Sequence, residues 1–134
     1  MSPRPAPVEF AQEILRVAIE AYLAARAVAS RVFFERGILD ALGMLDEIDA
    51  LTREEVDRYV AEYRYFHAVF LLPPWQQIYR TDAERDQTFA ESVRVHDAVC
   101  RWYARCGYDL VMVPRAAVEE RCTFVLETLE RCAG

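Results

Sequence analysis

Three short, unbroken runs of apolar residues divide the chain, and segments with helical spacing fill the intervals between them. The runs lie in Arg31–Glu35, Ala68–Leu72 and Leu110–Val113. Because both faces of a parallel sheet are covered, its strands have continuous apolar runs of this kind. Prolines follow the second and third runs, and proline cannot donate a hydrogen bond to a strand ladder. The pattern therefore predicts three buried strands.

The segment from Val8 to about Ala29 has the spacing of an amphipathic helix. Its apolar positions recur at offsets of three, four or seven residues, with charged residues between them. This period places the apolar side chains along one side of a helix. The predicted apolar face consists of Phe10, Ile14, Val17, Ala21 and Val28.

Four further helices are predicted, and two of them begin with a capping motif. In a capping box, a Thr hydroxyl and a Glu carboxylate three residues later accept hydrogen bonds from free amides at the helix start. Thr52-x-x-Glu55 and Thr81-x-x-Glu84 both have this form. The four helices run from Ile38 to about Ile48, from Thr52-x-x-Glu55 through Tyr63, from Ala83 to about Arg105, and from Ala116 to about Cys132.

Glycine and apolar spacing complete the prediction for the last two helices. Gly107 stands where a glycine usually ends a helix. The final helix is expected to bury one face, formed by Val118, Cys122, Val125, Leu126 and Leu129.

Strands that alternate with helical segments are the pattern of β-α-β units in a parallel sheet. We therefore predict an α/β fold, a three-layer sandwich in which a short parallel sheet of about three strands is flanked by about five helices. The chain has 134 residues, of which 54% are hydrophobic, which is enough for one domain with its own core. Met1–Pro7 is expected to be a flexible lead, and 8–132 the body of the domain.

The composition of the chain disfavours some classes of binding partner. A net charge of −6 and a pI near 5.0 disfavour nucleic acid, which binds basic surfaces. No apolar run reaches the roughly 20 residues of a membrane span. The four cysteines form no C-x-x-C pair and follow no signal peptide, which favours a reduced, cytoplasmic protein. All 16 basic residues are arginine.

Glu35 and Arg36 end the first apolar run and are the first candidates for chemistry. Ligands of open parallel sheets collect beyond the carboxyl ends of the strands. There, a carboxylate can position Mg²⁺ or accept a hydroxyl proton, while a guanidinium neutralises phosphate charge. An adjacent Glu-Arg pair after a strand is also typical of a solvated turn.

Arg80 and Arg85 form a second candidate group, and they flank Asp82 and Glu84. A lid at about 75–105 that closes arginines onto phosphates would have this composition. An ordinary surface helix has the same composition.

Histidines, cysteines and aromatic residues suggest packing rather than a site. His96 and Cys100 are four residues apart on a helix and would form half of a zinc site, but no second pair has matching spacing. His67 has no evident partner in the sequence. Core packing is the favoured interpretation of the aromatic residues Tyr59, Tyr63, Tyr65 and Phe66, with a stacking surface for a ligand as the alternative.

Three longer motifs occur in order along the chain. They are FFERG-x-x-D-x-x-G at 33–43, FLLPPW-x-x-IYR-x-D-x-ER at 70–85, and GY-x-L-V-x-VPR-x-x-VEER at 107–121. Together they resemble the predicted ATPases of the AAA_28-type P-loop family. That family groups with nicotinamide riboside kinase and is similar to thymidylate and deoxynucleoside kinases. The resemblance extends from about Val8 to Leu129.

The resemblance implies ATP and Mg²⁺ as cofactors, a small-molecule substrate, and phosphoryl transfer or ATP hydrolysis as the activity. It also implies roles for individual residues. Glu35 would be the base or Mg²⁺ positioner, Arg36, Arg80 and Arg85 would clamp phosphates, Asp40 would contact the substrate, and Pro114 and Arg115 would begin the loop near the nucleobase.

The chain departs from the family at the phosphate-binding loop. A P-loop requires G-x-x-x-x-G-K-[ST], but the sequence has no lysine, and its glycines, at 37, 43, 107 and 134, are dispersed. The chain thus resembles a member without its first β-α unit and without a Walker A motif. We expect weak or absent MgATP binding and no catalysis by the isolated chain. The alternative is a non-catalytic binding or assembly protein on the same scaffold.

The same departure predicts an assembly property. In the related kinases the P-loop strand lies between the strands that correspond to Arg31–Glu35 and Ala68–Leu72. Without that strand, either these two pair directly or their exposed edges attract another chain. We expect self-association into a homo-oligomer.

Overall fold

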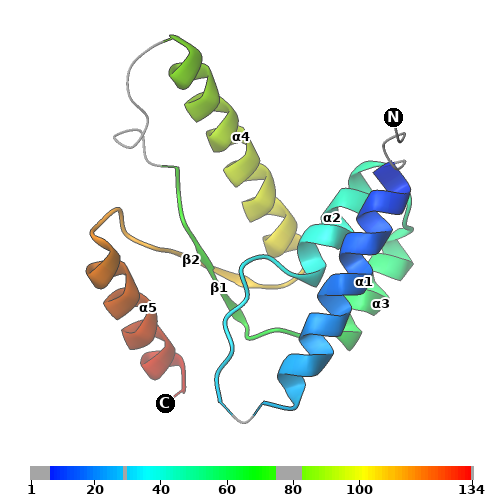
Figure 1. The fold of residues 1–134 in the computed structure, drawn as a ribbon, viewed down its shortest axis with the longest axis horizontal. Coiled ribbons are helices and arrows are strands. Elements are labelled where there is room, and N and C mark those ends of the chain that lie inside the picture. Colours follow the sequence, from blue (N-terminus) through cyan, green and yellow to red (C-terminus); the bar gives the residue numbers. More distant parts are fainter. Residues whose placement is uncertain (1–6, 29, 75–82, 134) are drawn as a thin grey trace, which may run out of the picture. The chain divides into compact units, whose positions relative to one another are not determined.

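The computed structural model describes residues 7–28, 30–74 and 83–133, and of residues 83–88 and 133 it describes the backbone alone. The chain folds as two compact units, Met1–Tyr65 and Phe66–Gly134. The first contains three of the described helices, and the second contains two helices and two strands (Figure 1). The predicted mixture of helices with a short parallel sheet is confirmed. That the whole chain is one domain stays a prediction.

The first unit is built around α2 (Ile38–Glu47), which α1 (Pro7–Arg26) and α3 (Arg53–Glu62) contact. Five apolar residues of α2 have at most 2% of their surface exposed, whereas Met44 is half-buried. Burying such side chains is the main favourable contribution to folding. The core residues that α2 supplies are Ile38, Leu39, Ala41, Leu42 and Leu45.

The start of α3 has the predicted capping box. The Thr52 Oγ1 accepts from the Glu55 N–H at 3.1 Å, and the Glu55 Oε1 accepts from the Thr52 N–H at 3.0 Å. These bonds satisfy two of the amides that a helix start leaves without partners. The second predicted box, at Thr81, lies outside the described residues.

The face that α1 buries differs from the predicted apolar face. Ala11, Leu15 and Tyr22 are buried, whereas Phe10 and Val17 have half of their surface exposed. The helix carries apolar residues on more than one side, and only the side that includes Leu15 is buried. The spacing therefore predicted the helix correctly but not the side on which its neighbour packs.

The first predicted strand, Arg31–Glu35, is not a strand in this structure. It lies in the connection between α1 and α2, and its apolar side chains are exposed (Figure 1). A strand is defined by hydrogen bonds to a neighbour, and no backbone hydrogen bond joins Arg31–Arg36 to another segment in the described part of the chain. The first predicted strand is thus corrected to an apolar segment that is unpaired among the described residues.

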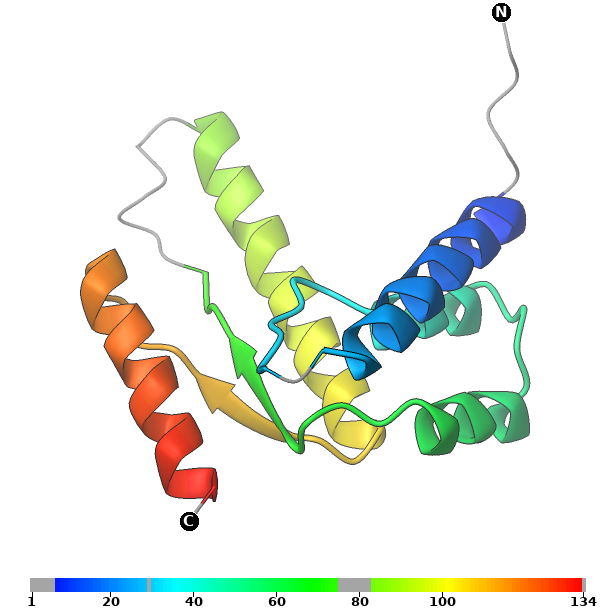
Figure 2. The ribbon, with the colours of Figure 1, turned by 60° about the horizontal axis from the view of Figure 1, so that its bottom comes forward.

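The second unit contains the sheet. β1 (Ala68–Leu71) and β2 (Asp109–Met112) pair in parallel, with Ala68 opposite Asp109 and Leu71 opposite Met112. The strand pair lies between α4 (Ala83–Arg105) and α5 (Val118–Ala133) in Figures 1 and 2. Both strands agree with the predicted runs to within a residue or two. The parallel pairing requires the long crossover that α4 supplies.

Glycine ends α4 as predicted, while α5 buries less than expected. Gly107 has φ +91°, which favours a residue without a Cβ. Of the five residues predicted for the buried face of α5, Leu129 is buried, whereas Val118 and Leu126 are about half exposed. Thr128, beside Leu129, is buried instead, and its hydroxyl donates to the Phe124 carbonyl at 2.7 Å. No helix in the described ranges has both the length and the apolar character that crossing a bilayer demands.

Candidate functional site

Glu35 and Arg36 lie at the bend that precedes α2, and both side chains are exposed. Arg36 has φ +66°, in the left-handed region that residues with a Cβ occupy at a cost of about 1–2 kcal/mol. Neither residue takes part in an ion pair among the described side chains. The pair therefore presents a carboxylate and a guanidinium to solvent on a strained turn.

The start of α2, directly after this turn, is fixed by a tyrosine from the end of the first unit. The Tyr65 hydroxyl accepts from the Ile38 N–H at 3.0 Å, and a Cβ added at Gly37 would lie 2.6 Å from that hydroxyl. Gly37 itself has an extended backbone, with φ −174°. Glycine is needed here because Tyr65 approaches closely, and not because of backbone conformation.

Asp40, the predicted substrate contact, participates in the same helix start. Its Oδ2 accepts from the Gly37 N–H at 2.8 Å, as the third helical residue does in a capping box. An acidic residue in the first turn also interacts favourably with the helix dipole. The structure thus gives Asp40 a capping role, and its contact with a substrate stays a prediction.

The aromatic residues of the first unit pack on one another. The Tyr65 ring meets Tyr22 and Phe34 edge to face, with centroid distances of 5.2 and 5.5 Å. The Tyr22 ring also meets Tyr63 at 5.5 Å. Burial of the Tyr63 hydroxyl raises its pKa, and the neighbouring Glu62 adds to the shift. Packing is therefore a role of these rings, which agrees with the interpretation favoured from the sequence.

In the second unit, the carboxyl ends of β1 and β2 lie side by side, as the parallel pairing dictates. Arg115, three residues after β2, donates from its Nε to the Pro74 carbonyl at 3.1 Å, three residues after β1. This hydrogen bond ties the two strand ends together. Arg115 is exposed and makes no other hydrogen bond to the described residues. The guanidinium has five N–H donors, so four remain available.

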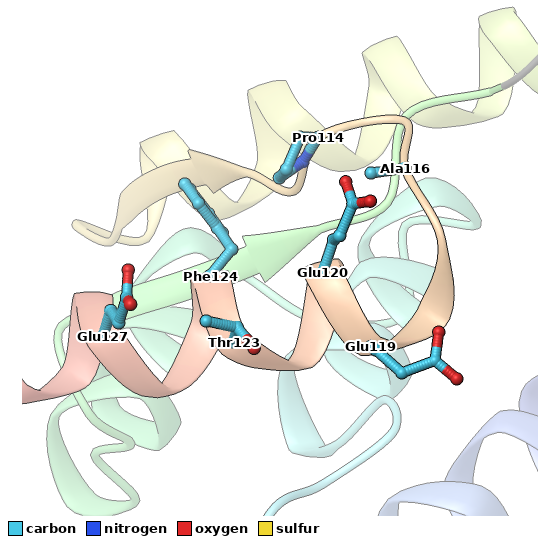
Figure 3. A pocket seen from close by; sticks show the side chains of 7 residues that line it. All are labelled: Pro114, Ala116, Glu119, Glu120, Thr123, Phe124 and Glu127. Atoms are coloured by element: carbon cyan, nitrogen blue, oxygen red, sulfur yellow. The ribbon is translucent and has the colours of Figure 1, made fainter.

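An open hollow of about 400 Å³ lies beside this edge, between the β2–α5 connection and the first turns of α5 (Figure 3). The Phe124 side chain and Pro114 give it an apolar wall, and the Glu120 carboxylate extends toward Ala116. The Glu119 carboxylate points away from Pro114 and Ala116. The hollow combines an apolar surface with negative charge, so its own walls disfavour a phosphate. Its lining is Pro114, Ala116, Glu119, Glu120, Thr123, Phe124 and Glu127.

The predicted arginine lid is described only in part. Arg80 lies outside the described residues, and Arg85 falls in the first turn of α4, where the backbone alone is described. The clamping role of both residues stays a prediction.

Histidine and cysteine contacts are local. The His67 Nδ1 lies 3.3 Å from the Asp109 Oδ2 on the neighbouring strand, so His67 has a partner that the sequence did not reveal. The His96 Nε2 lies 3.5 Å from the Cys100 Sγ, and burial raises the pKa of that thiol. Among the residues with described positions, no group of three His, Cys, Asp or Glu side chains is arranged to hold a metal ion.

The comparison with protein families decides the class of the chain. The sequence model of an AAA domain family, AAA_28, matches residues 1–121, which include every site residue predicted from the sequence. The chain belongs to the AAA_28 family. No curated protein and no solved structure matches it.

Membership of the AAA_28 family confirms the family to which the three motifs pointed and indicates a P-loop NTPase-like, nucleotide-binding class of function. The similarity to nicotinamide riboside kinase and thymidylate kinase stays a prediction. The structure adds two features of this AAA_28 chain that sequence reasoning missed. One is Tyr65 as the cap of α2, and the other is the hydrogen bond from Arg115 to Pro74. The proximity of Arg115 to Pro74 was open to inference, because prolines mark where two neighbouring parallel strands end.

Proposed function

We propose that this chain is a nucleotide-binding domain that places the nucleobase at the carboxyl edge of β1 and β2. The observation that carries the proposal is the Arg115 Nε donating to the Pro74 carbonyl at 3.1 Å. It holds an otherwise unused guanidinium at the edge where ligands of parallel sheets bind. The planar guanidinium can donate two parallel hydrogen bonds or stack on a ring.

The neighbouring hollow supports a base rather than a phosphate at this edge. Pro114 and Phe124 offer an apolar surface of the kind on which a planar ring packs. Glu120 supplies an acceptor for an exocyclic amino group, whereas its charge repels phosphate. These properties fit the role that the AAA_28 resemblance gives to Pro114 and Arg115.

The residues of this chain do not make a complete site for MgATP. Phosphate affinity in P-loop proteins comes from a glycine-rich nest of amides together with a lysine, and the sequence contains no lysine. Mg²⁺ is usually held by one or two carboxylates together with substrate phosphates, and Glu35 would supply one. Exposed arginines such as Arg36 contribute only about 0–1 kcal/mol each and are screened by salt. We propose that the chain as it stands binds MgATP weakly and does not hydrolyse it.

A non-catalytic assembly role is the second candidate function. It is favoured by the exposed apolar side chains of Arg31–Glu35, which a nucleotide-binding role does not require. A reducing compartment such as the cytoplasm is proposed for either function, because Cys100, Cys106, Cys122 and Cys132 are all free thiols.

The test is calorimetric titration of adenosine and of MgATP into the purified chain and its Arg115→Ala variant. Arg94→Ala is the matched control, since Arg94 is an exposed arginine of α4. We expect millimolar binding of both ligands, several-fold weaker in Arg115→Ala and unchanged in Arg94→Ala, with no phosphate release. Equal binding by all three proteins would refute the placement of the base. Micromolar MgATP binding that is lost in Glu35→Ala or Arg36→Ala would show that the chain builds a phosphate site without a P-loop.

A further inference from the structure

We propose that Arg31–Glu35 pairs in antiparallel orientation with the same segment of a second copy of this chain, giving a two-fold symmetric dimer. The proposal concerns an interaction surface in the first unit and does not depend on nucleotide binding. It rests on three features of the segment: its unpaired backbone, its exposed apolar side chains and the order of its charges.

The backbone of the segment is free to form a ladder. Within the described part of the chain, the N–H and C=O groups of residues 31–36 make no backbone hydrogen bond. Residues 31–34 run without a helix, turn or bend between the bends at Ser30 and Glu35. An unpaired strand of this kind is a template for pairing with another chain.

Apolar side chains are exposed at three consecutive positions. The exposed fractions are 42% for Val32, 60% for Phe33 and 38% for Phe34. Single exposed apolar residues are ordinary, but a contiguous exposed group marks an interaction site. The Phe34 ring packs edge to face on the Tyr65 ring of its own chain. In a strand Val32 would share the side of Phe34, which leaves Phe33 on the other side with Arg31 and Glu35.

The order of residues makes the segment complementary to itself. When two copies of RVFFE lie antiparallel and centred on Phe33, each Arg31 stands opposite Glu35 of the second copy. Val32 then stands opposite Phe34, and the two Phe33 side chains meet at the symmetry axis. Opposite charges, β-branched with aromatic residues, and paired aromatics are the cross-strand combinations that stabilise a sheet. Parallel pairing would instead put arginine opposite arginine and glutamate opposite glutamate.

The two ends of the segment limit how far this pairing extends. Arg36, with φ +66°, turns the chain out of the strand direction immediately after Glu35. A five-residue ladder buries less surface than a standard protein interface does. The dimer is therefore weak, and its population depends on protein concentration. Because both copies use the same surface, the two-fold symmetric contact occupies that surface on each chain and stops the assembly at a dimer.

Charge reversal tests this register. Arg31→Glu places glutamate opposite glutamate in a homodimer, and Glu35→Arg places arginine opposite arginine. An equimolar mixture of the two variants restores every opposite-charge pair. In sedimentation velocity runs from low to high micromolar concentration, we expect the unmodified chain to dimerise and each single variant to associate about tenfold more weakly. We expect the mixture to recover association to near the unmodified level.

Arg94→Glu and Glu91→Arg are the matched controls, because they make the same charge changes at exposed positions of α4. They should dimerise like the unmodified chain, alone and mixed. Amide hydrogen exchange should slow at residues 31–35 as concentration rises. A chain that is monomeric throughout this range overturns the proposal. So does a mixture of Arg31→Glu and Glu35→Arg that associates no better than its components, or dimerisation without protection of residues 31–35.

Discussion

Gly37 occupies a position where one added carbon meets a fixed neighbour. The Tyr65 hydroxyl would lie 2.6 Å from a Cβ at this site. That hydroxyl is not free to move, since it accepts from the Ile38 N–H and its ring packs on Tyr22 and Phe34. The space at Gly37 is therefore set by the same contact that caps α2.

Gly37→Ala should destabilise the first unit by about 1–3 kcal/mol, the usual cost of forcing a side chain into an occupied site. Tyr65→Phe removes the hydroxyl and should cost about 0.5–1.5 kcal/mol through the lost hydrogen bond to Ile38. In the Tyr65→Phe background, Gly37→Ala should cost less than in the unmodified chain. Urea unfolding followed by far-UV circular dichroism measures the four proteins of this cycle. Strictly additive effects would show that Tyr65 is not the obstacle.

Local motifs predicted single residues well when both partners were close in sequence. The bonds between Thr52 and Glu55 follow from a four-residue pattern. The bond from Ile38 to Tyr65 joins residues that no short pattern relates. The same limit applies to His67, whose partner Asp109 comes from the adjacent strand.

At the scale of the element, the capping box of α3 makes its stability depend on pH. The hydrogen bond from the Thr52 backbone N–H lowers the pKa of Glu55, and the Thr52 side chain adds to the shift. A carboxyl whose pKa is lower in the folded state stabilises that state above its unfolded pKa. This contribution is lost as pH falls through the folded pKa.

Glu55→Ala should therefore destabilise the chain at neutral pH, and the difference from the unmodified chain should shrink as the pH is lowered from about 7 to about 3. Glu54→Ala is the control, because Glu54 is also in the first turn but has no bond to the cap. Urea unfolding across this pH range measures both differences. A constant Glu55→Ala effect at all pH values would contradict the assigned cause.

The two sides of α1 give a second prediction at this scale. Leu15 is 7% exposed and Val17 is 50% exposed, although the sequence placed Val17 on the apolar face. Leu15→Ala should cost about 2–5 kcal/mol by leaving a cavity, whereas Val17→Ala should change stability by no more than about 0.5 kcal/mol. Chemical denaturation of the two variants ranks them directly. The reverse order would mean that α1 turns its other side to the core.

For the whole molecule, the order of helices and two of the three strands could be predicted from the sequence. Apolar periodicity is a local property that indicates helices and strands. The residues Pro73, Gly107 and Pro114 mark where elements end, and this is also a local property. Pairing is not local, so the apolar run at Arg31–Glu35 was indistinguishable from the run at Ala68–Leu72. The first has no partner among the described residues, and the second pairs with β2.

The candidate site, like the fold, could be predicted only as far as local sequence patterns determine it. Arg115 follows β2 as the sequence predicted, whereas Glu35 follows no strand, because Arg31–Glu35 is unpaired among the described residues. The bond from the Gly37 N–H to Asp40 is local, whereas the contact between Arg115 and Pro74 depends on the folded arrangement of elements. The sequence therefore indicates candidate residues for a site. The packing of elements determines which of them already make contacts within the protein.

The division into two units also determines which part of the protein is the source of its tryptophan fluorescence. Both tryptophans, Trp75 and Trp102, belong to the span Phe66–Gly134, while Met1–Tyr65 contains tyrosine but no tryptophan. Indole fluorescence consequently originates in the span that holds β1 and β2, whereas the intrinsic emission of Met1–Tyr65 comes from its tyrosines.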